Sequence, residues 1–163
     1  MYKFLRIVVL LLLSVVVACS DENNSSSTAA NNTSLIRVYT PDGNILKKDF
    51  NVEIADTNEK IYHGLMGRTS LDINSGMLFD ITLVPKDMDI AFWMKDTPIS
   101  LDVLFIDEKG IIYFIHENAQ PYDTTPIYPQ KRPRAVLEIN GGQVQKLGIK
   151  VGDMLKADLL GNN

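Results

Sequence analysis

The chain has 163 residues, of which 45% are hydrophobic and 22% charged, so it can form one domain with a buried core and is not a disordered polyelectrolyte. Its formal net charge of −4 offers no basic footprint for a phosphate backbone, so we expect no nucleic acid partner. The single cysteine excludes an internal disulfide framework.

The first 18 residues have the layout of a secretion signal. Lys3 and Arg6 form a basic start, residues 7–13 are an unbroken apolar run, and the segment closes on Val16-Val17-Ala18-Cys19. This layout resembles a bacterial lipoprotein signal with its lipobox, which predicts cleavage before Cys19 and acylation of that residue. A transmembrane anchor is the alternative, but the apolar stretch is shorter than the roughly 20 residues that span a bilayer. Membrane lipid, held through acylated Cys19, is therefore an expected partner.

Residues 19–34 are expected to contain the lipidated cysteine and a flexible linker, because positions 20–34 are small or polar apart from two alanines. Removing Lys3 and Arg6 with the signal leaves 14 basic and 20 acidic residues, a net charge near −6. The pair Asp21-Glu22 either resembles an export signal for the cell surface or belongs to a merely soluble linker. We expect a lipid-anchored protein of the cell envelope that faces the periplasm or the cell exterior.

The folded domain, residues 35–163, begins with strand-like patterns. Asp56 follows an alternating segment and is a suitable N-cap, and Glu59 completes a capping-box pattern for a short helix. Gly67 suits the left-handed residue that ends such a helix. The predicted elements of this part are a strand from residue 35, a strand at 52–55, a helix at about 57–66, a loop at 69–76 and an apolar segment at 77–79.

The middle and the end of the chain are rich in short β-segments. Pro98 interrupts the ladder, residues 107–110 read as a turn, and the four prolines within 120–133 predict a stiff extended loop. Asn140 is a suitable N-cap for a second short helix that ends at Gly148. The predicted elements are strands at 89–94, 101–106, 111–116, 135–139 and 154–159, and a helix at 143–147.

The segments at 101–106 and 111–116 are apolar on both faces, so both faces must be covered. We therefore predict one mostly β (α+β) domain, a compact and barrel-like, largely antiparallel sheet with two short helices. The Gly141-Gly142 pair before the second helix either presents backbone amides to an anion or permits a tight turn.

Several blocks, in this order and spacing, resemble an uncharacterised prokaryotic family, domain of unknown function 192. The blocks are 53–56 (EIAD), 64–68 (GLMGR), 76–79 (GMLF), 92–98 (FWMKDTP), 101–102 (LD), 136–138 (VLE) and 148–153 (GIKVGD). The resemblance implies a compact, mostly β domain with a barrel-like sheet and short helices, and it implies no established activity. Many members resemble one another in a cysteine pair where this chain has Tyr122 and Ile127, so a role tied to that pair is absent here. Asp96 stands where the family usually has asparagine, which puts a neutral hydrogen-bonding role in doubt.

Two carboxylates lie within apolar strands. Strand periodicity places Asp102 on the face of Leu104, and Glu138 on the face of Val136. A buried carboxylate must be paired or protonated, and Arg68 and Lys95 are the expected counter-charges. The hypothesis is that one cluster at an end of the barrel either binds a small polar or carbohydrate-like ligand or only locks the turns to the sheet. For the domain as a whole, an envelope protein is the alternative partner. The cluster comprises Arg68, Trp93, Lys95, Asp96, Asp102 and Glu138.

Two further functions remain alternatives to a non-catalytic binding module. A small envelope hydrolase could use Asp102 and Glu138 as acid and base, although no adjacent motif supports it. A copper carrier could use His63 with thioether ligands, which suit Cu(I), although methionine is more often core filler. The methionines in question are Met66, Met77, Met88 and Met94. We expect no cofactor and no metal as a resident group.

Overall fold

The computed structural model describes residues 33–162; the predicted signal segment, Cys19 and the polar linker up to residue 32 lie outside the described residues. No helix in the described range is long and apolar enough to cross a membrane. The strands are β1 (Thr33–Tyr39), β2 (Leu46–Ala55), β3 (Ser75–Asp80), β4 (Leu101–Ile106), β5 (Ile112–Ala119), β6 (Ala135–Asn140) and β7 (Met154–Lys156). The helices are α1 (Asn58–His63) and α2 (Gln143–Leu147), with 3₁₀ turns at Ile81–Leu83 and Asp158–Leu160.

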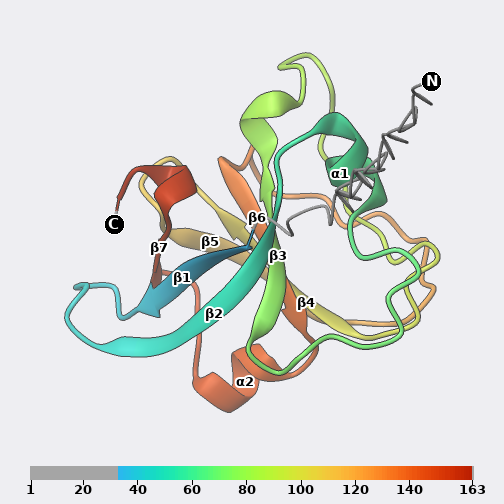
Figure 1. Ribbon diagram of the computed structural model, residues 1–163. Coiled ribbons are helices and arrows are strands. Elements are labelled where there is room, and N and C mark those ends of the chain that lie inside the picture. The colour runs from blue at the N-terminus through green and yellow to red at the C-terminus, as the bar shows by residue number, and fades with distance from the viewer. Residues whose placement is uncertain (1–32, 163) are drawn as a thin grey trace, which may run out of the picture. The chain divides into compact units, whose positions relative to one another are not determined.

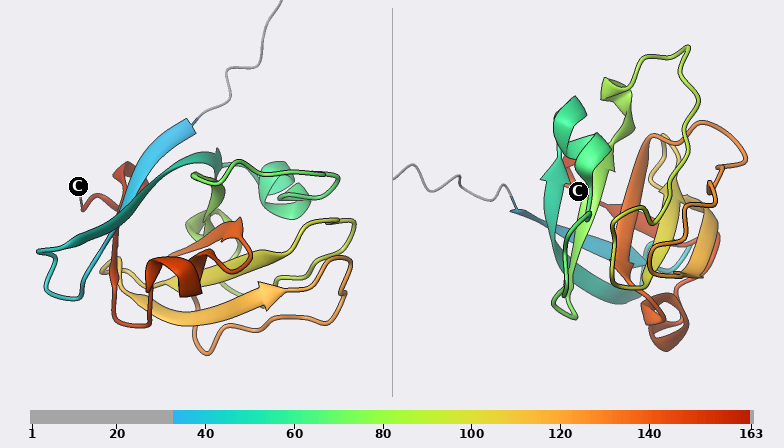
Figure 2. Two further views of the ribbon diagram at one scale, coloured as in Figure 1. Left: turned by 90° about the horizontal axis from the view of Figure 1, so that it is seen from below. Right: turned by 90° about the vertical axis from the view of Figure 1, so that its right-hand side faces the viewer.

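The seven strands form one sheet in the order β5-β4-β6-β3-β2-β1-β7 (Figure 1). Only β2 and β3 run parallel; every other neighbouring pair is antiparallel. The sheet curls into a half-barrel (Figure 2). An isolated bridge between Ile111, the residue before β5, and Met154 of β7 connects its two edges. The predicted mostly β, largely antiparallel fold with two short helices is confirmed.

A separate hydrophobic core lies on each face of the sheet. All seven strands contribute to one cluster, here called the inner core, which includes Leu104 and Leu137. The other cluster, the outer core, contains Val103 and Val136 together with residues of the segments that cover that face. Two cores explain why β4 and β6 are apolar on both faces, since alternate residues of each strand enter different cores.

Helix α1 is shorter than predicted at both ends. Its N-cap is Thr57, whose hydroxyl accepts a hydrogen bond from the Lys60 amide at 3.2 Å, and not Asp56. Asp56 instead accepts from the Lys60 ammonium at 2.6 Å. The helix ends at Gly64, whose φ of +51° favours glycine, so the chain turns three residues before Gly67.

The predicted strand at 89–94 is wrong. This segment makes a single bridge, between Phe92 and Ile127 of the proline-rich loop. The Phe92 ring packs edge-on against Phe79 at 5.2 Å and Phe105 at 5.7 Å between centroids. The apolar pattern therefore reflects a loop that covers the outer core and not a strand of the sheet. The predicted bounds of 101–106 for β4 and 143–147 for α2 are confirmed.

Candidate functional site

Asp102 is fully buried in β4, and backbone amides surround its carboxylate. Oδ1 accepts hydrogen bonds from the amides of Asn118 at 2.8 Å and Gly142 at 3.1 Å. Oδ2 accepts from the amide of Val144 at 2.8 Å. These bonds satisfy the charge without any cation, so the predicted pairing of Asp102 with Lys95 or Arg68 is wrong.

Asp102 also replaces the predicted cap of α2. The N-cap position is Gly142, which makes no side-chain cap bond, and not Asn140. Asn140 donates instead to the carbonyls of Leu71 and Asp72, both at 3.0 Å. The Gly142 amide does meet an anion, but that anion is the protein's own carboxylate. Asp102 is thus a structural residue that fixes α2 to the sheet.

Glu138 of β6 lies on the opposite face of the sheet from Asp102. In the β4–β6 register Glu138 is directly opposite Val103, an outer-core residue, whereas Asp102 is opposite Ile139 of the inner core. Successive side chains of a strand point to opposite faces, so the two carboxylates are separated by the sheet. They cannot act as acid and base across one cleft.

The Glu138 carboxyl has no partner. Its side chain is only 5% exposed, and no hydrogen bond or ion pair reaches it from any residue of the described range. Burial raises the pKa of Glu138 to about 8, because the ionised form has lost water and gained no compensating charge. At neutral pH the group is therefore mostly a neutral acid.

Glu138 lines a cavity of about 380 Å³. One wall is α1 with the turn that follows it, the other is the segment 81–93, and Phe79 of β3 and Glu138 of β6 complete the lining. Figure 1 shows α1 and the loop after β3 at the same end of the molecule. The size falls within the range of small-molecule sites, and most of the lining is apolar. The aliphatic lining residues include Ile61, Leu65, Ile81, Val84 and Ile90.

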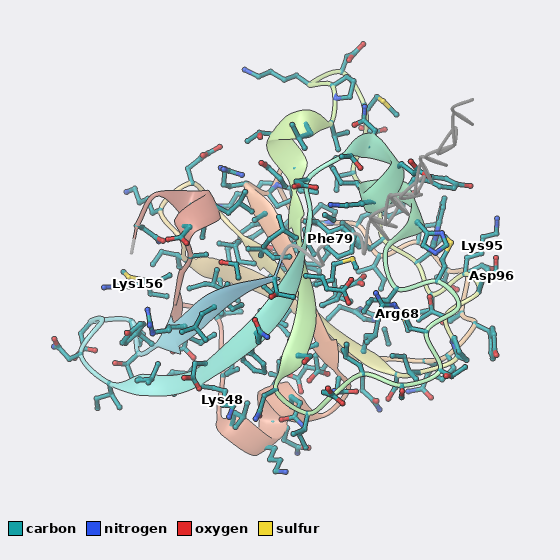
Figure 3. All side chains as sticks on the ribbon, viewed as in Figure 1. Lys48, Arg68, Phe79, Lys95, Asp96 and Lys156 are labelled. Carbon is teal, nitrogen blue, oxygen red and sulfur yellow. The ribbon has the colours of Figure 1, made fainter. Side chains whose placement is uncertain are left out.

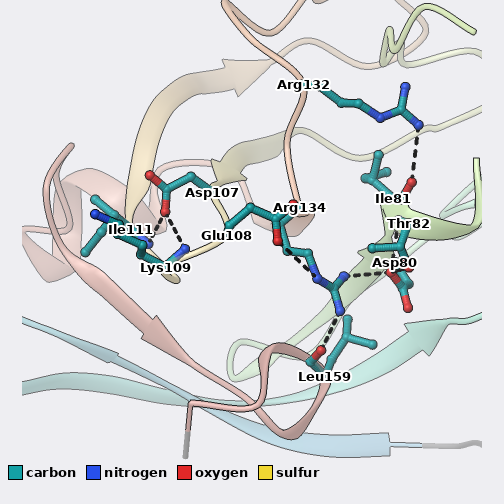
Figure 4. A network of polar contacts seen from close by, with 10 residues as sticks. All are labelled: Asp80, Ile81, Thr82, Asp107, Glu108, Lys109, Ile111, Arg132, Arg134 and Leu159. Atoms are coloured by element: carbon teal, nitrogen blue, oxygen red, sulfur yellow. Dashed lines mark hydrogen bonds and ion pairs between the residues drawn. The ribbon is translucent and has the colours of Figure 1, made fainter. Parts of the chain in front are cut away.

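Arg132 holds one wall of this cavity in place. Its guanidinium donates to the carbonyls of Val84 at 2.6 Å, Met88 at 3.0 Å and Pro85 at 3.2 Å. The neighbouring Arg134 pairs with Asp80 at 2.7 Å and donates to the carbonyl of Leu159 at 2.6 Å (Figure 4). Arg132, in the proline-rich loop, thus holds the segment that follows β3. Arg134, the residue before β6, holds the end of β3.

Three residues of the predicted cluster make no hydrogen bond or ion pair with either carboxylate. Arg68 pairs with Glu53 at 2.7 Å and does not line the cavity. Lys95 and Asp96 are exposed at the edge of the molecule, distant from Phe79 (Figure 3). Asp96 has a φ of +52°, and its carbonyl accepts from the Gly67 amide at 2.7 Å. Aspartate and asparagine both tolerate this conformation, so the position has a backbone role.

The cavity does bring together other residues that the sequence singled out. Trp93, 41% exposed, lines it with Glu138, and so do His63 and Met66. Met88 is a further lining residue, whereas Met77 and Met94 are buried in the outer core. Among residues 33–162 no group of three His, Cys, Asp or Glu side chains is placed to hold a metal ion.

Sequence reasoning missed the aromatic residues Tyr62 and Phe92 and the acidic Asp89, which also line the cavity. The sequence places Tyr62 in the helix predicted at about 57–66, and Phe92 and Asp89 in the strand predicted at 89–94. One feature of the sequence pointed to this part of the cavity. Residues 89–94 include more apolar side chains than an edge strand requires to cover its single buried face.

The model of the DUF192 family (domain of unknown function 192), described as an uncharacterized ACR, matches residues 38–157. One similar crystal structure is a protein of Sinorhizobium meliloti 1021 with the provisional description of transcription regulator. It is 35% identical, with a TM-score of 0.70, over 78% of this chain and 95% of that one. A protein of unknown function from Novosphingobium aromaticivorans DSM 12444 is 36% identical, with a TM-score of 0.68, over 76% of this chain and 84% of that one. No curated protein matches the chain.

Proposed function

The chain belongs to the DUF192 family, and from that premise we propose that it is a lipid-anchored, non-catalytic binding module of the cell envelope. The ligand is a small molecule with an apolar body that enters the cavity between α1 and residues 81–93. The observation that carries this function is the unpaired Glu138 carboxyl, buried beside an apolar cavity of about 380 Å³. Burying an ionisable group without a partner destabilises a fold, so its presence in a cavity favours a functional reason.

The cellular location in this proposal rests on the sequence. The basic start, the short apolar run and the small residues before Cys19 support acylation of that cysteine. The polar linker that follows leaves the domain free to meet ligands in the periplasm or at the cell exterior.

The alternatives have weaker support. A hydrolase that pairs Asp102 with Glu138 is excluded by their positions on opposite faces of the sheet. For a copper carrier, His63, Met66 and Met88 line the cavity and remain candidate ligands. Met77 and Met94 are buried in the outer core and are not available as ligands there. Regulation of transcription, suggested by the S. meliloti relative, would require a nucleic acid interface, for which a net charge of −4 is unfavourable.

Trp93 provides a direct test, because it is the only tryptophan of the chain and it lines the cavity. The full chain in maltoside micelles is screened with a library of small ligands for changes in tryptophan fluorescence and melting temperature. Ala91→Phe places a bulky ring at a lining position, and Thr124→Phe adds the same ring at an exposed position outside the cavity.

We expect ligands that act on the parent chain and on Thr124→Phe but not on Ala91→Phe. The proposal is wrong if no library member binds, or if binding survives unchanged in Ala91→Phe.

A further inference from the structure

The charged groups at the cavity are predominantly acidic. Its lining contains Glu138 and Asp89, with His63 as the one ionisable base, and none of the described lining residues is a lysine or arginine. A ligand with a negative charge would meet two acids and no fixed counter-charge. A ligand with a positive charge would supply the partner that Glu138 lacks.

The cavity also contains four aromatic side chains, Tyr62, Phe79, Phe92 and Trp93. Phe79 and Phe92 pack edge-on with their ring centroids 5.2 Å apart, so these two rings support each other. Aromatic faces attract cations through their quadrupole, and cages of such rings combined with an acid recognise quaternary ammonium groups.

Most of the side chains that line the cavity carry no oxygen or nitrogen acceptor for a hydrogen bond. A primary ammonium carries three N–H donors that need acceptors once water is removed. Apart from the carboxyls of Glu138 and Asp89, the polar side chains in the lining are those of Asn58, Tyr62 and His63. An alkylated ammonium needs few or no acceptors and gains from contact with the aliphatic walls.

We propose that the cavity binds an alkylated, preferably quaternary, ammonium group, held between the aromatic side chains with Glu138 as its counter-ion. This inference rests on the proposed binding function and names the chemical class of its ligand. Such a group is found in small solutes and in lipid headgroups, and the cavity chemistry suits both.

Binding should then be linked to loss of the Glu138 proton. A cation stabilises the carboxylate, so affinity rises about tenfold per pH unit below the pKa of about 8 and levels off above it. The other titratable groups that line the cavity are Tyr62 and His63 on α1 and Asp89 in the segment 81–93; β3 contributes only Phe79. Protonation of His63 also opposes a cation, so His63→Gln is needed to isolate the Glu138 contribution.

The test compares choline with 3,3-dimethylbutan-1-ol, which has the same shape but no charge. Calorimetry is performed on the full chain in maltoside micelles, between about pH 6 and pH 8. We expect choline to bind roughly tenfold or more tightly than the neutral alcohol. In a His63→Gln background, Glu138→Gln should remove the pH dependence and most of this preference. Asp102→Asn and Glu117→Gln lie outside the cavity and should retain both.

A second variant tests the inference in case Glu138→Gln does not fold. Trp93→Phe keeps a smaller ring at a partly exposed position and should weaken choline severalfold while leaving the neutral alcohol nearly unchanged. Glycerophosphocholine distinguishes the sources: tighter binding than choline indicates a lipid headgroup, and weaker binding indicates a free solute.

Equal or tighter binding of the neutral alcohol would overturn the inference while leaving the binding function intact. If choline, the neutral alcohol and the whole ligand library all fail to bind, the inference and the proposed function fall together.

Discussion

Replacing Glu138 by glutamine should change how the stability of the protein depends on pH. The carboxyl titrates near 4.5 in the unfolded chain and at about 8 in the folded one. Below about pH 4.5 both states are protonated, so the carboxyl causes no pH-dependent loss of stability. As pH rises from 4.5 to 8, the unfolded state releases this proton while the folded state retains it, which progressively favours unfolding. Above pH 8 both states are ionised and the loss levels off.

A pKa raised from 4.5 to about 8 corresponds, at ~1.4 kcal/mol per pH unit, to a total loss of about 5 kcal/mol. Roughly 3 to 4 kcal/mol of this loss falls between pH 5 and pH 8. Glutamine has the same size and no charge, so the variant lacks this loss. Urea unfolding followed by circular dichroism at several pH values measures the difference between the two proteins.

The matched control is Glu117→Gln, which removes the same charge from an exposed position on β5. We expect Glu138→Gln to gain about 3 kcal/mol on the parent chain as pH rises from 5 to 8, and the control to follow the parent. Parallel pH profiles for Glu138→Gln and the parent would refute the reasoning, because they would mean that the folded carboxyl is solvated or paired.

Three further substitutions test the surroundings of the site. Asp102→Asn turns an acceptor of the Val144 amide into a donor, which should cost about 1–3 kcal/mol in urea unfolding and leave cavity binding unchanged; a parallel loss of binding would contradict the separation of the two faces. Arg132→Met removes the hydrogen bonds that hold one cavity wall, so amide exchange of residues 84–91 should accelerate while β6 stays protected; unchanged exchange would show that the wall is held otherwise. Gly64→Ala places a methyl group at φ +51° and ψ −131°, a conformation that glycine adopts far more easily than alanine, and within 3.3 Å of the Phe79 ring. It should lower stability by about 1–3 kcal/mol, and a neutral effect would show that the turn can relax.

The sequence predicted those elements whose bounds are set by residues close together in the chain. The apolar run at 101–106 forms β4, and residues 107–110 form the turn that leads to β5. The turn is a local structure, because Asp107 accepts hydrogen bonds from the amides of Lys109 and Ile111, both at 3.0 Å. The end of α2 followed from Gly148, which adopts the left-handed conformation with a φ of +63°.

Long-range polar contacts could not be predicted in the same way. The amides at the start of α2 donate to a carboxylate from β4, 40 residues earlier than Gly142 in the chain, and no local pattern marks that pairing. The rule that buried carboxylates need partners was correct for Asp102, but the partners are backbone amides, which every residue type except proline can supply.

The candidate site was only partly visible in the sequence for a related reason. Glu138 and Trp93 stood out as a charge in a strand and a lone tryptophan, and both line the cavity. Tyr62 and Phe92 did not stand out, because the cavity exists only where α1 and the segment 81–93 meet in space. The placement of Asp102 and Glu138 on opposite faces required the β4–β6 register, which is a tertiary property.

The central claim is that the buried Glu138 carboxyl has no partner in the free protein and that a bound cation supplies one. Its carboxyl ¹³C resonance, followed by NMR from acid to alkaline pH with and without saturating choline, tests this claim most directly. The account predicts a midpoint at about 8 in the free protein and a lower midpoint with choline bound. A free-protein midpoint near the ordinary 4.5, or one that choline leaves unmoved, would contradict it.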